Sequence, residues 1–335
     1  MIIRESLEQY EQQYLNSYAT LSMNSKGRLV QEEECDIRTV FQRDRDRILH
    51  CKSFRRLKDK TQVFLTPKGD HYRTRLTHTL EVSQNARTIA KALRLNEDLV
   101  EAIALGHDLG HTPFGHAGER ALNTVCPEGF LHNEQSVRTV DYLEKNGMGL
   151  NLTMEVRDGI LNHQTADTPS TSEGKIVRVS DKIAYIYHDM DDAMRAGLII
   201  EDDVPVEIKK AIGYTTKDRL DYLIHDIVTE SMKCSEIRMS REGEEALKEL
   251  RKFMFQRVYR NPEAKSEEIK AEHVMYALYE HFCNHFESLP QEYLTGMEQR
   301  GDSKERIVCD YIGAMTDRFA ISLYEELTIP KSWHG

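Results

Sequence analysis

The sequence predicts an all-α fold, and three observations support this prediction. The chain has 335 residues, of which 39% are hydrophobic and 30% charged, with only 18 Gly and 8 Pro. Few helix-breaking residues among many charged ones are typical of helical rather than sheet-rich proteins. Apolar residues recur at helical spacing, and a strand-like pattern is confined to residues 61–65. We therefore expect packed helices with at most a small β-hairpin.

This spacing and the signals for helix ends place the elements along the chain. Tyr10, Tyr14 and Tyr18 recur every four residues and predict the first helix. Asn96 is a good N-cap, because two acidic residues follow it in the first turn of the next predicted helix. A turn signal after residue 65 makes 61–73 a hairpin or loop. The predicted helices are 5–20, one or two within 38–60, 77–95, 97–105, 119–125, 133–143, 154–162, 175–196, 217–235, 241–259, 266–287 and 303–326, with loops at 22–34 and 165–174.

Cellular location and cysteine usage can also be predicted. No apolar run approaches the ~20 residues that a membrane span needs. The first ten residues are charged and lack the apolar core of a signal peptide, so we expect a cytoplasmic protein. The six cysteines are scattered and form no Cys-x-x-Cys pair, which predicts buried, reduced thiols. Any metal ion is then expected to bind His and carboxylate side chains.

The charge of the chain is unevenly distributed. The net charge is −11, which argues against general nucleic-acid coating. Between residues 35 and 75, however, twelve Lys or Arg stand against five Asp or Glu. This basic segment either binds a small polyanion, such as a nucleotide phosphate, or forms ion pairs on a solvated surface. At 43–47, where Arg and Asp alternate, an ion-pair network is the favoured interpretation.

The densest group of candidate functional residues lies at 104–119, where histidines and acids alternate with glycines. Neighbouring residues on a helix point about 100° apart. His107 and Asp108 can therefore reach one ion only where a helix ends, and Gly106 and Gly110 are compatible with a bend there. The alternative interpretation of the pair alone is a polar helix terminus with capping side chains.

A second polar group forms a stripe on the predicted helix 175–196. Its members are spaced i, i+4, i+7 or i+8, and i+11, which places them on one helical face. On a helix this apolar, the stripe either faces solvent or lines a site, and the tyrosine in it favours a site. The polar face holds Asp181, Tyr185, His188, Asp189 and Asp192, and the apolar face holds Ile183, Ile186, Met190 and Met194.

The order His78, His107-Asp108 and Asp181 resembles the metal-dependent phosphohydrolases that contain an HD domain. Further segments resemble one branch of them, the deoxyguanosine triphosphate triphosphohydrolase-like family, over roughly residues 35–330. A lone His-Asp pair is a weak signal, whereas the joint set in this order is specific. The matching segments are Phe41-Gln-Arg-Asp-Arg-Asp-Arg-Ile, Phe54-Arg-Arg-Leu, Lys60-Thr-Gln-Val-Phe, Tyr72-Arg-Thr-Arg-Leu-Thr-His78, residues 107–119, His132-Asn-Glu-Gln-Ser and Asp310-Tyr-Ile-Gly-Ala-Met-Thr-Asp-Arg.

The resemblance implies an HD-domain helical fold with additional C-terminal helices. The implied parts are an N-terminal helical extension at 1–34, the HD core at 35–200 and a C-terminal helical region at 201–335 that packs on the core. One divalent metal ion is implied as cofactor. Two imidazoles and two carboxylates suit a borderline or hard ion, so Mn, Mg, Fe, Ni and Zn all stay open. The implied ligands are His78, His107, Asp108 and Asp181.

The resemblance also implies catalytic roles. His116 and Glu119 match a catalytic dyad, and their i, i+3 spacing at a helix start places the carboxylate beside the imidazole. Such a carboxylate fixes the tautomer of the histidine and raises its basicity, so that the histidine can move a proton at neutral pH. His132 matches a candidate acid for the leaving oxygen.

The implied substrate-binding residues are Gln62, Arg75, His111, Lys182, Tyr185 and Asp189. In this family picture Arg75 contacts phosphate, and Tyr185 packs at C2′ of the sugar and helps to exclude a ribose 2′-hydroxyl. Asp189 and Gln62 hold the 3′-hydroxyl. His111 either contacts phosphate or stabilises its loop. His163 and His188 are expected to be structural, Arg55 and Arg56 face phosphates or a neighbouring subunit, and Arg257 and Tyr259 are candidates for the pocket wall.

The expected activity is hydrolysis of dGTP or other dNTPs at the α-phosphate, which yields deoxynucleoside and inorganic triphosphate. One alternative is an HD-domain nucleotidase or phosphodiesterase acting on deoxynucleoside monophosphates, and the joint presence of Arg75, His116 and Glu119 counts against it. The other is a nucleotide-sensing regulator, which the intact ligand set counts against. The implied partners are a dNTP substrate, a dNTP activator and further copies of the chain, from dimer to hexamer. Neither a membrane nor nucleic acid is expected as the primary partner.

Overall fold

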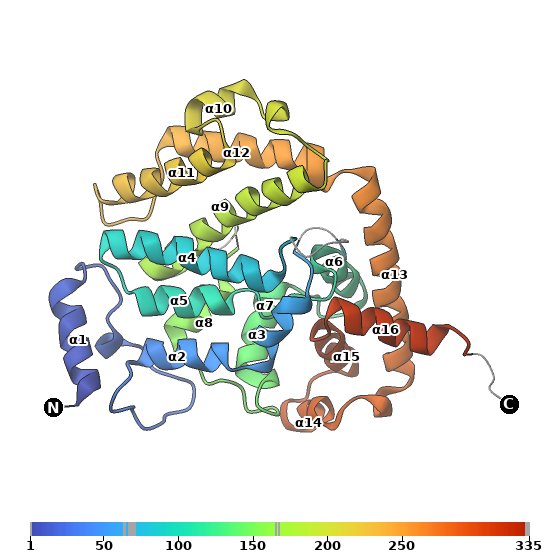
Figure 1. Cartoon of the computed structure of the whole chain (residues 1–335). Helices are drawn as coiled ribbons and strands as arrows, with labels where there is room; N and C mark the ends of the chain where they lie inside the picture. Colours follow the sequence, from blue (N-terminus) through green and yellow to red (C-terminus); the bar gives the residue numbers. More distant parts are fainter. Residues whose placement is uncertain (1, 63–64, 66–71, 165, 167, 332–335) are drawn as a thin grey trace. The chain divides into compact units, whose positions relative to one another are not determined.

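The computed structural model describes residues 2–62, 65, 72–164, 166 and 168–331 (Figure 1). Helices and turns are the regular structure of these residues, apart from two isolated antiparallel bridges, Arg28 with Thr153 and Thr61 with Thr74. The predicted all-α fold is therefore confirmed. Most of the predicted 61–73 hairpin lies outside the described residues. Among the helices described, none is long and apolar enough to cross a membrane.

The chain divides into two compact units. The first comprises Met1–His50, Thr77–His107 and Leu150–Pro262, and the second comprises Cys51–Leu76, Asp108–Gly149 and Glu263–Gly335. One division falls at the peptide bond between His107 and Asp108. The division expected from the sequence, at residues 34/35 and 200/201, stays a prediction.

The first unit is built around helix α5. Its helices are α1 (Ile3–Tyr14), α2 (Val40–Leu49), nearly all of α4 (Arg75–Leu93), α5 (Glu97–Gly106), α8 (Met154–Leu161), α9 (Ser172–Arg195), α10 (Val206–Ile212), α11 (Thr216–Ser231) and α12 (Arg241–Met254), which ends in a π-helical turn, Phe255–Tyr259. All residues of α5 from Leu99 to Gly106 except Glu101 are buried, and α5 packs on α2, α8 and α9. As predicted, Asn96 caps α5 by accepting from the amide of Leu99 at 3.2 Å.

Glycines allow α5 and α8 to approach closely. A Cβ on Gly159 would lie 2.5 Å from the side chain of Ile103, and a Cβ on Gly106 would lie 2.5 Å from that of Ile160. The sequence suggested Gly106 as a bending residue, yet its backbone is not left-handed. Gly106 instead allows α8 to pack closely against the end of α5. The following residue, His107, therefore lies in a densely packed region.

The segment that follows α1 is not helical, and hydrogen bonds to buried carboxylates hold it in place. Three glutamates each accept from one backbone amide and one hydroxyl group of residues 20–26. Helix α1 ends at Tyr14, so the predicted helix 5–20 is too long, and these bonds satisfy backbone amides of the segment that follows it. The pairs are Glu11 with Ser22, Glu173 with Thr20, and Glu155 with Ser25 and Lys26, at 2.6–2.9 Å.

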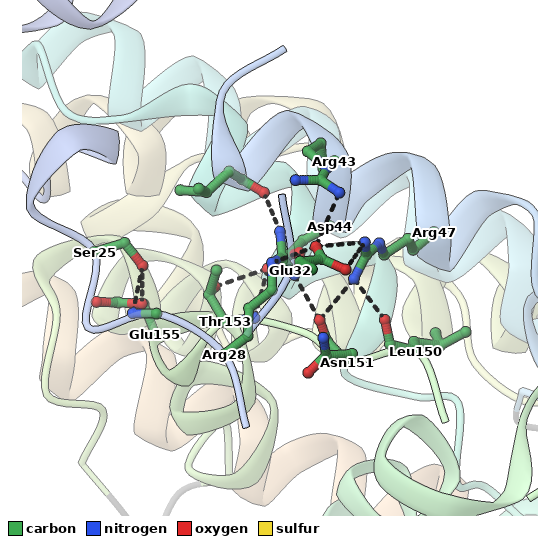
Figure 2. A network of polar contacts seen from close by, with 12 residues as sticks. Ser25, Arg28, Glu32, Arg43, Asp44, Arg47, Leu150, Asn151, Thr153 and Glu155 are labelled. Carbon is green, nitrogen blue, oxygen red and sulfur yellow. Dashed lines mark hydrogen bonds and ion pairs between the residues drawn. The ribbon is translucent and has the colours of Figure 1, made fainter. Parts of the chain in front are cut away.

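The alternating residues 43–47 form the ion pairs predicted from their pattern (Figure 2). Asp44 is fully buried, pairs with Arg28, and accepts from the amide and hydroxyl of Thr153 at 2.8 and 2.7 Å. Arg47 donates to both oxygens of Glu32 and to the carbonyl oxygens of Leu150 and Asn151. These bonds tie the loop before α2 to the segment that enters α8.

The second unit has its own apolar core. Its helices are α3 (Lys52–Arg56), α6 (Gly115–Val125), α7 (His132–Arg138) with a π-helical turn at Thr139–Leu143, α13 (Pro262–Asn284), α14 (Gln291–Arg300), α15 (Lys304–Gly313) and α16 (Asp317–Thr328). Leu122, Phe130, Met275 and Ile312 are among the residues of this core. Figure 1 shows the long α13 in orange and the C-terminal helices in red.

Some predicted helix boundaries are wrong. The single helix expected at 303–326 is two helices, because the hydroxyl of Thr316 accepts from the amide of Phe319 at 3.2 Å and starts α16 anew. The helix expected at 119–125 already begins at Gly115, and the sequence pattern missed α10 and α14. All six cysteines are free, with Cys51, Cys126 and Cys309 buried and the others partly exposed.

Candidate metal centre and catalytic residues

In the first unit three helices bring three potential ligands together. His78 comes from α4, His107 caps the end of α5, and Asp181 lies in α9. The Nε2 atoms of His78 and His107 lie 3.1 and 3.8 Å from the same carboxylate oxygen of Asp181. Both imidazoles are buried, with exposed fractions of 1% and 0%. Two nitrogens and one oxygen around one point fit a borderline divalent ion.

The tautomer of His107 suits this role. Its Nδ1 lies 2.7 Å from the carbonyl oxygen of Ala104, which makes Nδ1 the protonated nitrogen and directs the lone pair of Nε2 toward Asp181. Burial opposes ionisation of Asp181, but its hydrogen bond to His78 and the nearby His107 hold the pKa of the carboxyl group below its usual value. The carboxylate is therefore ready to bind a cation.

Asp108, the residue after His107, belongs to the second unit, where it contacts Arg75 and His111. Arg75 Nη1 lies 3.0 Å from one oxygen of Asp108, and His111 Nε2 lies 3.2 Å from the other. The ring of His111 stacks on that of His132 with 3.9 Å between centroids. Burial, together with the charges of Arg75 and His132, lowers the pKa of His111 well below its usual value, so this ring is neutral. The contact with Asp108 holds His111 within its loop, and the predicted phosphate contact of His111 stays a prediction.

The predicted dyad is part of a larger cluster. His116 Nδ1 lies 3.1 Å from Glu119 Oε2, in agreement with their i, i+3 spacing. The other oxygen, Oε1, accepts from the backbone amide and ring Nδ1 of His132, at 2.8 Å each. Burial would raise the pKa of Glu119, but its bonds to His116 and His132 lower it strongly. Glu119 is thus an ionised carboxylate between two imidazoles, of which His116 is half exposed.

The polar stripe of α9 does not face solvent. Three of its side chains are buried within the first unit, namely those of His188, Asp189 and Asp192. The hydroxyl of Tyr259, from the π-helical turn after α12, donates to Asp189, and its ring stacks on Tyr185 with 5.4 Å between centroids. The sequence alternative of a solvent-facing stripe is therefore wrong.

Comparisons with known proteins agree with this geometry. Residues 75–186 match the model of the HD domain, and residues 237–326 match that of a phosphohydrolase-associated domain. Deoxyguanosinetriphosphate triphosphohydrolase-like proteins are 53% identical in Caldanaerobacter subterraneus, over 99% of this chain and 98% of that protein, and 47% identical in Desulfatibacillum aliphaticivorans, over 98% and 99%. One from Clostridium perfringens is 48% identical over 99% of both chains.

The chain belongs to the deoxyguanosinetriphosphate triphosphohydrolase-like family. It is thus a hydrolase of the HD phosphohydrolase class, and its buried His and Asp groups can hold a metal ion. A solved structure of a hypothetical protein from Aquifex aeolicus is 20% identical with a TM-score of 0.48, and covers 86% of this chain and 68% of that one.

The remaining family-implied residues lie as follows. Lys182 is partly buried in the first unit, where burial and the charges of Arg178 and Arg251 lower its pKa. Gln62 is buried in the second unit, and no described group bonds its side-chain oxygen. His163 lies edge-on to His107 with 5.0 Å between centroids.

His188 Nδ1 lies 3.0 Å from Glu81 Oε2, and its ring lies edge-on to that of His78 with 6.0 Å between centroids. The sequence left His163 and His188 as structural histidines, and the structure places each beside a potential ligand. For His188, its place seven residues after Asp181 on α9 pointed to such a position, whereas no local pattern did so for His163.

Proposed function

We propose that the protein is a metal-dependent dNTP triphosphohydrolase, which hydrolyses dGTP or other dNTPs at the α-phosphate to deoxynucleoside and inorganic triphosphate. The observation that carries the proposal is the carboxylate of Glu119 between His116 and His132. A carboxylate that is hydrogen-bonded to two imidazoles supports two proton transfers in the hydrolysis of a phosphate ester: one from the attacking water and one to the leaving oxygen. Family membership supports the nucleotide substrate.

The proposed ligands of the ion are His78, His107, Asp108 and Asp181. When bound, a divalent ion supplies Lewis-acid chemistry at a phosphate oxygen and lowers the pKa of water. Its identity among Mn, Mg, Fe, Ni and Zn is part of the proposal to be tested.

The residues of the chain itself have distinct proposed roles. Arg75 is oriented by Asp108 and by the carbonyl oxygen of Thr61, to which its Nε donates at 3.1 Å, and its fixed guanidinium neutralises charge on the phosphate oxygens. His116 accepts a proton from the attacking water, with Glu119 stabilising the imidazolium. His132 donates a proton to the leaving oxygen of the nucleoside.

The sugar is proposed to lie against α9. Tyr185 packs at C2′ and Asp189 accepts from the 3′-hydroxyl, together with Gln62, while Lys182 binds phosphate. The bond from Tyr259 to Asp189 supports this assignment, because it orients the carboxylate beside the ring of Tyr185. Assembly from dimer to hexamer, activation by a second dNTP and a cytoplasmic location complete the proposal.

Product analysis tests the proposal. The purified protein is incubated with Mn²⁺ and each dNTP, alone and with a second dNTP as activator, and products are separated by chromatography. We expect deoxynucleoside and inorganic triphosphate in equal amounts. Monophosphate or pyrophosphate products would favour the HD nucleotidase or phosphodiesterase instead. If a variant carrying His107→Ala and Asp108→Ala keeps its biological effect, the protein acts as a regulator.

A further inference from the structure

The loop that leads into the dyad has an unusual backbone. Phe114 has a φ of 62° and a ψ of 20°, and Gly115 has a φ of 56°, so two consecutive residues are left-handed immediately before His116. This conformation is disfavoured for a bulky side chain and persists only where the surroundings hold it. The side chain of Phe114 is buried in the core of the second unit.

A carboxylate from the C-terminal region holds this loop. Asp317, the first residue of α16, is 4% exposed. Its Oδ1 accepts from the backbone amide of Phe114 at 3.0 Å. Its Oδ2 accepts from the amide of Thr61 at 2.9 Å and also from the hydroxyl of Thr61. One buried side chain therefore joins the left-handed residue to a segment fifty residues earlier in the chain.

Lys60 holds the other end of the same loop. Its terminal amino group is buried and donates to the carbonyl oxygens of His111 and, at 2.9 Å, of Gly313. Within the loop, the hydroxyl of Thr112 donates to the carbonyl oxygen of Gly115 at 2.9 Å. The loop is thus fixed at both ends by side chains outside it.

We propose that Asp317 is a positioning residue, which sets the place of His116 and Glu119 by holding Phe114 in its left-handed conformation. Asp317 belongs to the Asp310–Arg318 segment, whose sequence matched the family without a role for this aspartate. The inference rests on the proposed function only for its effect on turnover. The effect on the loop itself stands independently.

Asp317→Asn is the central variant, and Asp226→Asn is its matched control. Asparagine has an NH₂ group in place of one carboxylate oxygen. This NH₂ group cannot accept a hydrogen bond, so it faces a donor of Thr61 or Phe114 without bonding it. Asp226→Asn makes the same change in the first unit, at a carboxylate that accepts from the backbone amide of Ser240 at 2.8 Å. Hydrogen exchange of the Phe114 amide, kcat and KM for dNTP are measured in all three proteins.

We expect the Phe114 amide to exchange at least ~10-fold faster in Asp317→Asn, and kcat to fall by ~10-fold or more, as for other small misplacements of catalytic groups. KM should stay within about twofold, since the substrate-binding side chains are untouched. Asp226→Asn should keep the exchange rate and kcat of the parent. A parent-like kcat in Asp317→Asn, or unchanged exchange at Phe114, would overturn the proposal.

A second variant covers the case in which Asp317→Asn does not fold. Replacing Phe114 by phenyllactic acid turns its amide into an ester, which removes only the N–H that Asp317 binds and keeps both side chains. A fall in kcat with unchanged KM supports the proposal, and unchanged kcat overturns it. If the parent protein hydrolyses no dNTP, the proposed function fails, while hydrogen exchange still decides whether Asp317 holds the loop.

Discussion

One oxygen of Glu119 accepts from both the backbone amide and the ring of His132, at 2.8 Å in each case. The same carboxylate bonds His116 through its other oxygen. The two histidines are sixteen residues apart in the chain, and Glu119 couples them. Loss of its charge should therefore affect both proton-transfer roles at once.

Glu119→Gln should lower kcat by about 10²-fold or more, since general acid–base catalysis contributes about 10²–10⁴-fold. KM for dNTP and metal content should change little, because Glu119 is proposed to touch neither. Steady-state kinetics and metal analysis measure these quantities. Glu272→Gln is the control, because Glu272 pairs with the neighbouring Arg120 on the surface at 3.0 Å. Equal losses in both variants would argue against a catalytic role of Glu119.

Gly115→Val should damage turnover more than metal binding. Gly115 has a φ of 56°, and a Cβ there would lie 3.2 Å from the guanidinium of Arg75, so valine displaces the start of α6 and His116 with it. Gly301→Val is the matched control, because Gly301 also has a positive φ, of 71°, but, its chain neighbours aside, no atom of the described residues lies within 4 Å of a Cβ there. Kinetics and equilibrium dialysis with Mn²⁺ check both variants. Loss of metal uptake in Gly115→Val would contradict this expectation.

Asp44→Asn should lower the free energy of unfolding by about 3 kcal/mol or more, because it leaves the charge of the buried Arg28 without its buried partner. Asp46→Asn should cost under about 1 kcal/mol, since Asp46 pairs with the half-exposed Arg38. Urea unfolding monitored by circular dichroism measures the two. Similar losses in both variants would mean that the network of Figure 2 does not stabilise the fold.

The stability of the protein should rise between about pH 7 and pH 10.5 through Lys60. Burial, and then the charge of Arg56, lower the pKa of Lys60 from 10.5 to about 7. Between these values the unfolded chain binds the proton and the folded chain does not, so the free energy of unfolding increases with pH. The neutral amine still has two N–H groups for its two carbonyl partners.

The measurement compares the parent protein with Lys60→Met in urea at several pH values from 7 to 10. The difference in unfolding free energy should grow in favour of the parent by up to a few kcal/mol, at about 1.4 kcal/mol per pKa unit. A difference that does not change with pH would show that Lys60 stays protonated throughout this range.

Tyr185→Ala should relax the discrimination against ribonucleotides. If Tyr185 packs at C2′ of the sugar, its removal makes room for a 2′-hydroxyl, so kcat/KM should fall for dGTP and the GTP-to-dGTP ratio of kcat/KM should rise. Tyr259→Phe keeps the ring that stacks on Tyr185 but removes the bond to Asp189. It should raise KM for dGTP and leave the ratio unchanged. An unchanged ratio in Tyr185→Ala would remove this residue from the sugar site.

The sequence by itself determined the helical class, the family and the local pairs of the site. Periodicity of 3.6 residues is a local signal, so α4, α5 and α9 were predicted to within a few residues. His116 and Glu119 are one turn apart, and their contact followed from helix geometry alone. The ion pairs of 43–47 could be expected from alternating charges, although their partners could not.

Tertiary structure decided the contacts between residues that are distant in the chain. Glu119 with His132, Asp189 with Tyr259, and Asp317 with Phe114 join different helices, and no periodicity encodes which helices pack together. The left-handed Phe114 was also hidden, because its conformation is unfavourable locally and is held by partners from elsewhere. Likewise α1 is shorter than its pattern suggests, and the amide of Thr20, inside the predicted helix 5–20, binds the distant buried carboxylate of Glu173 instead.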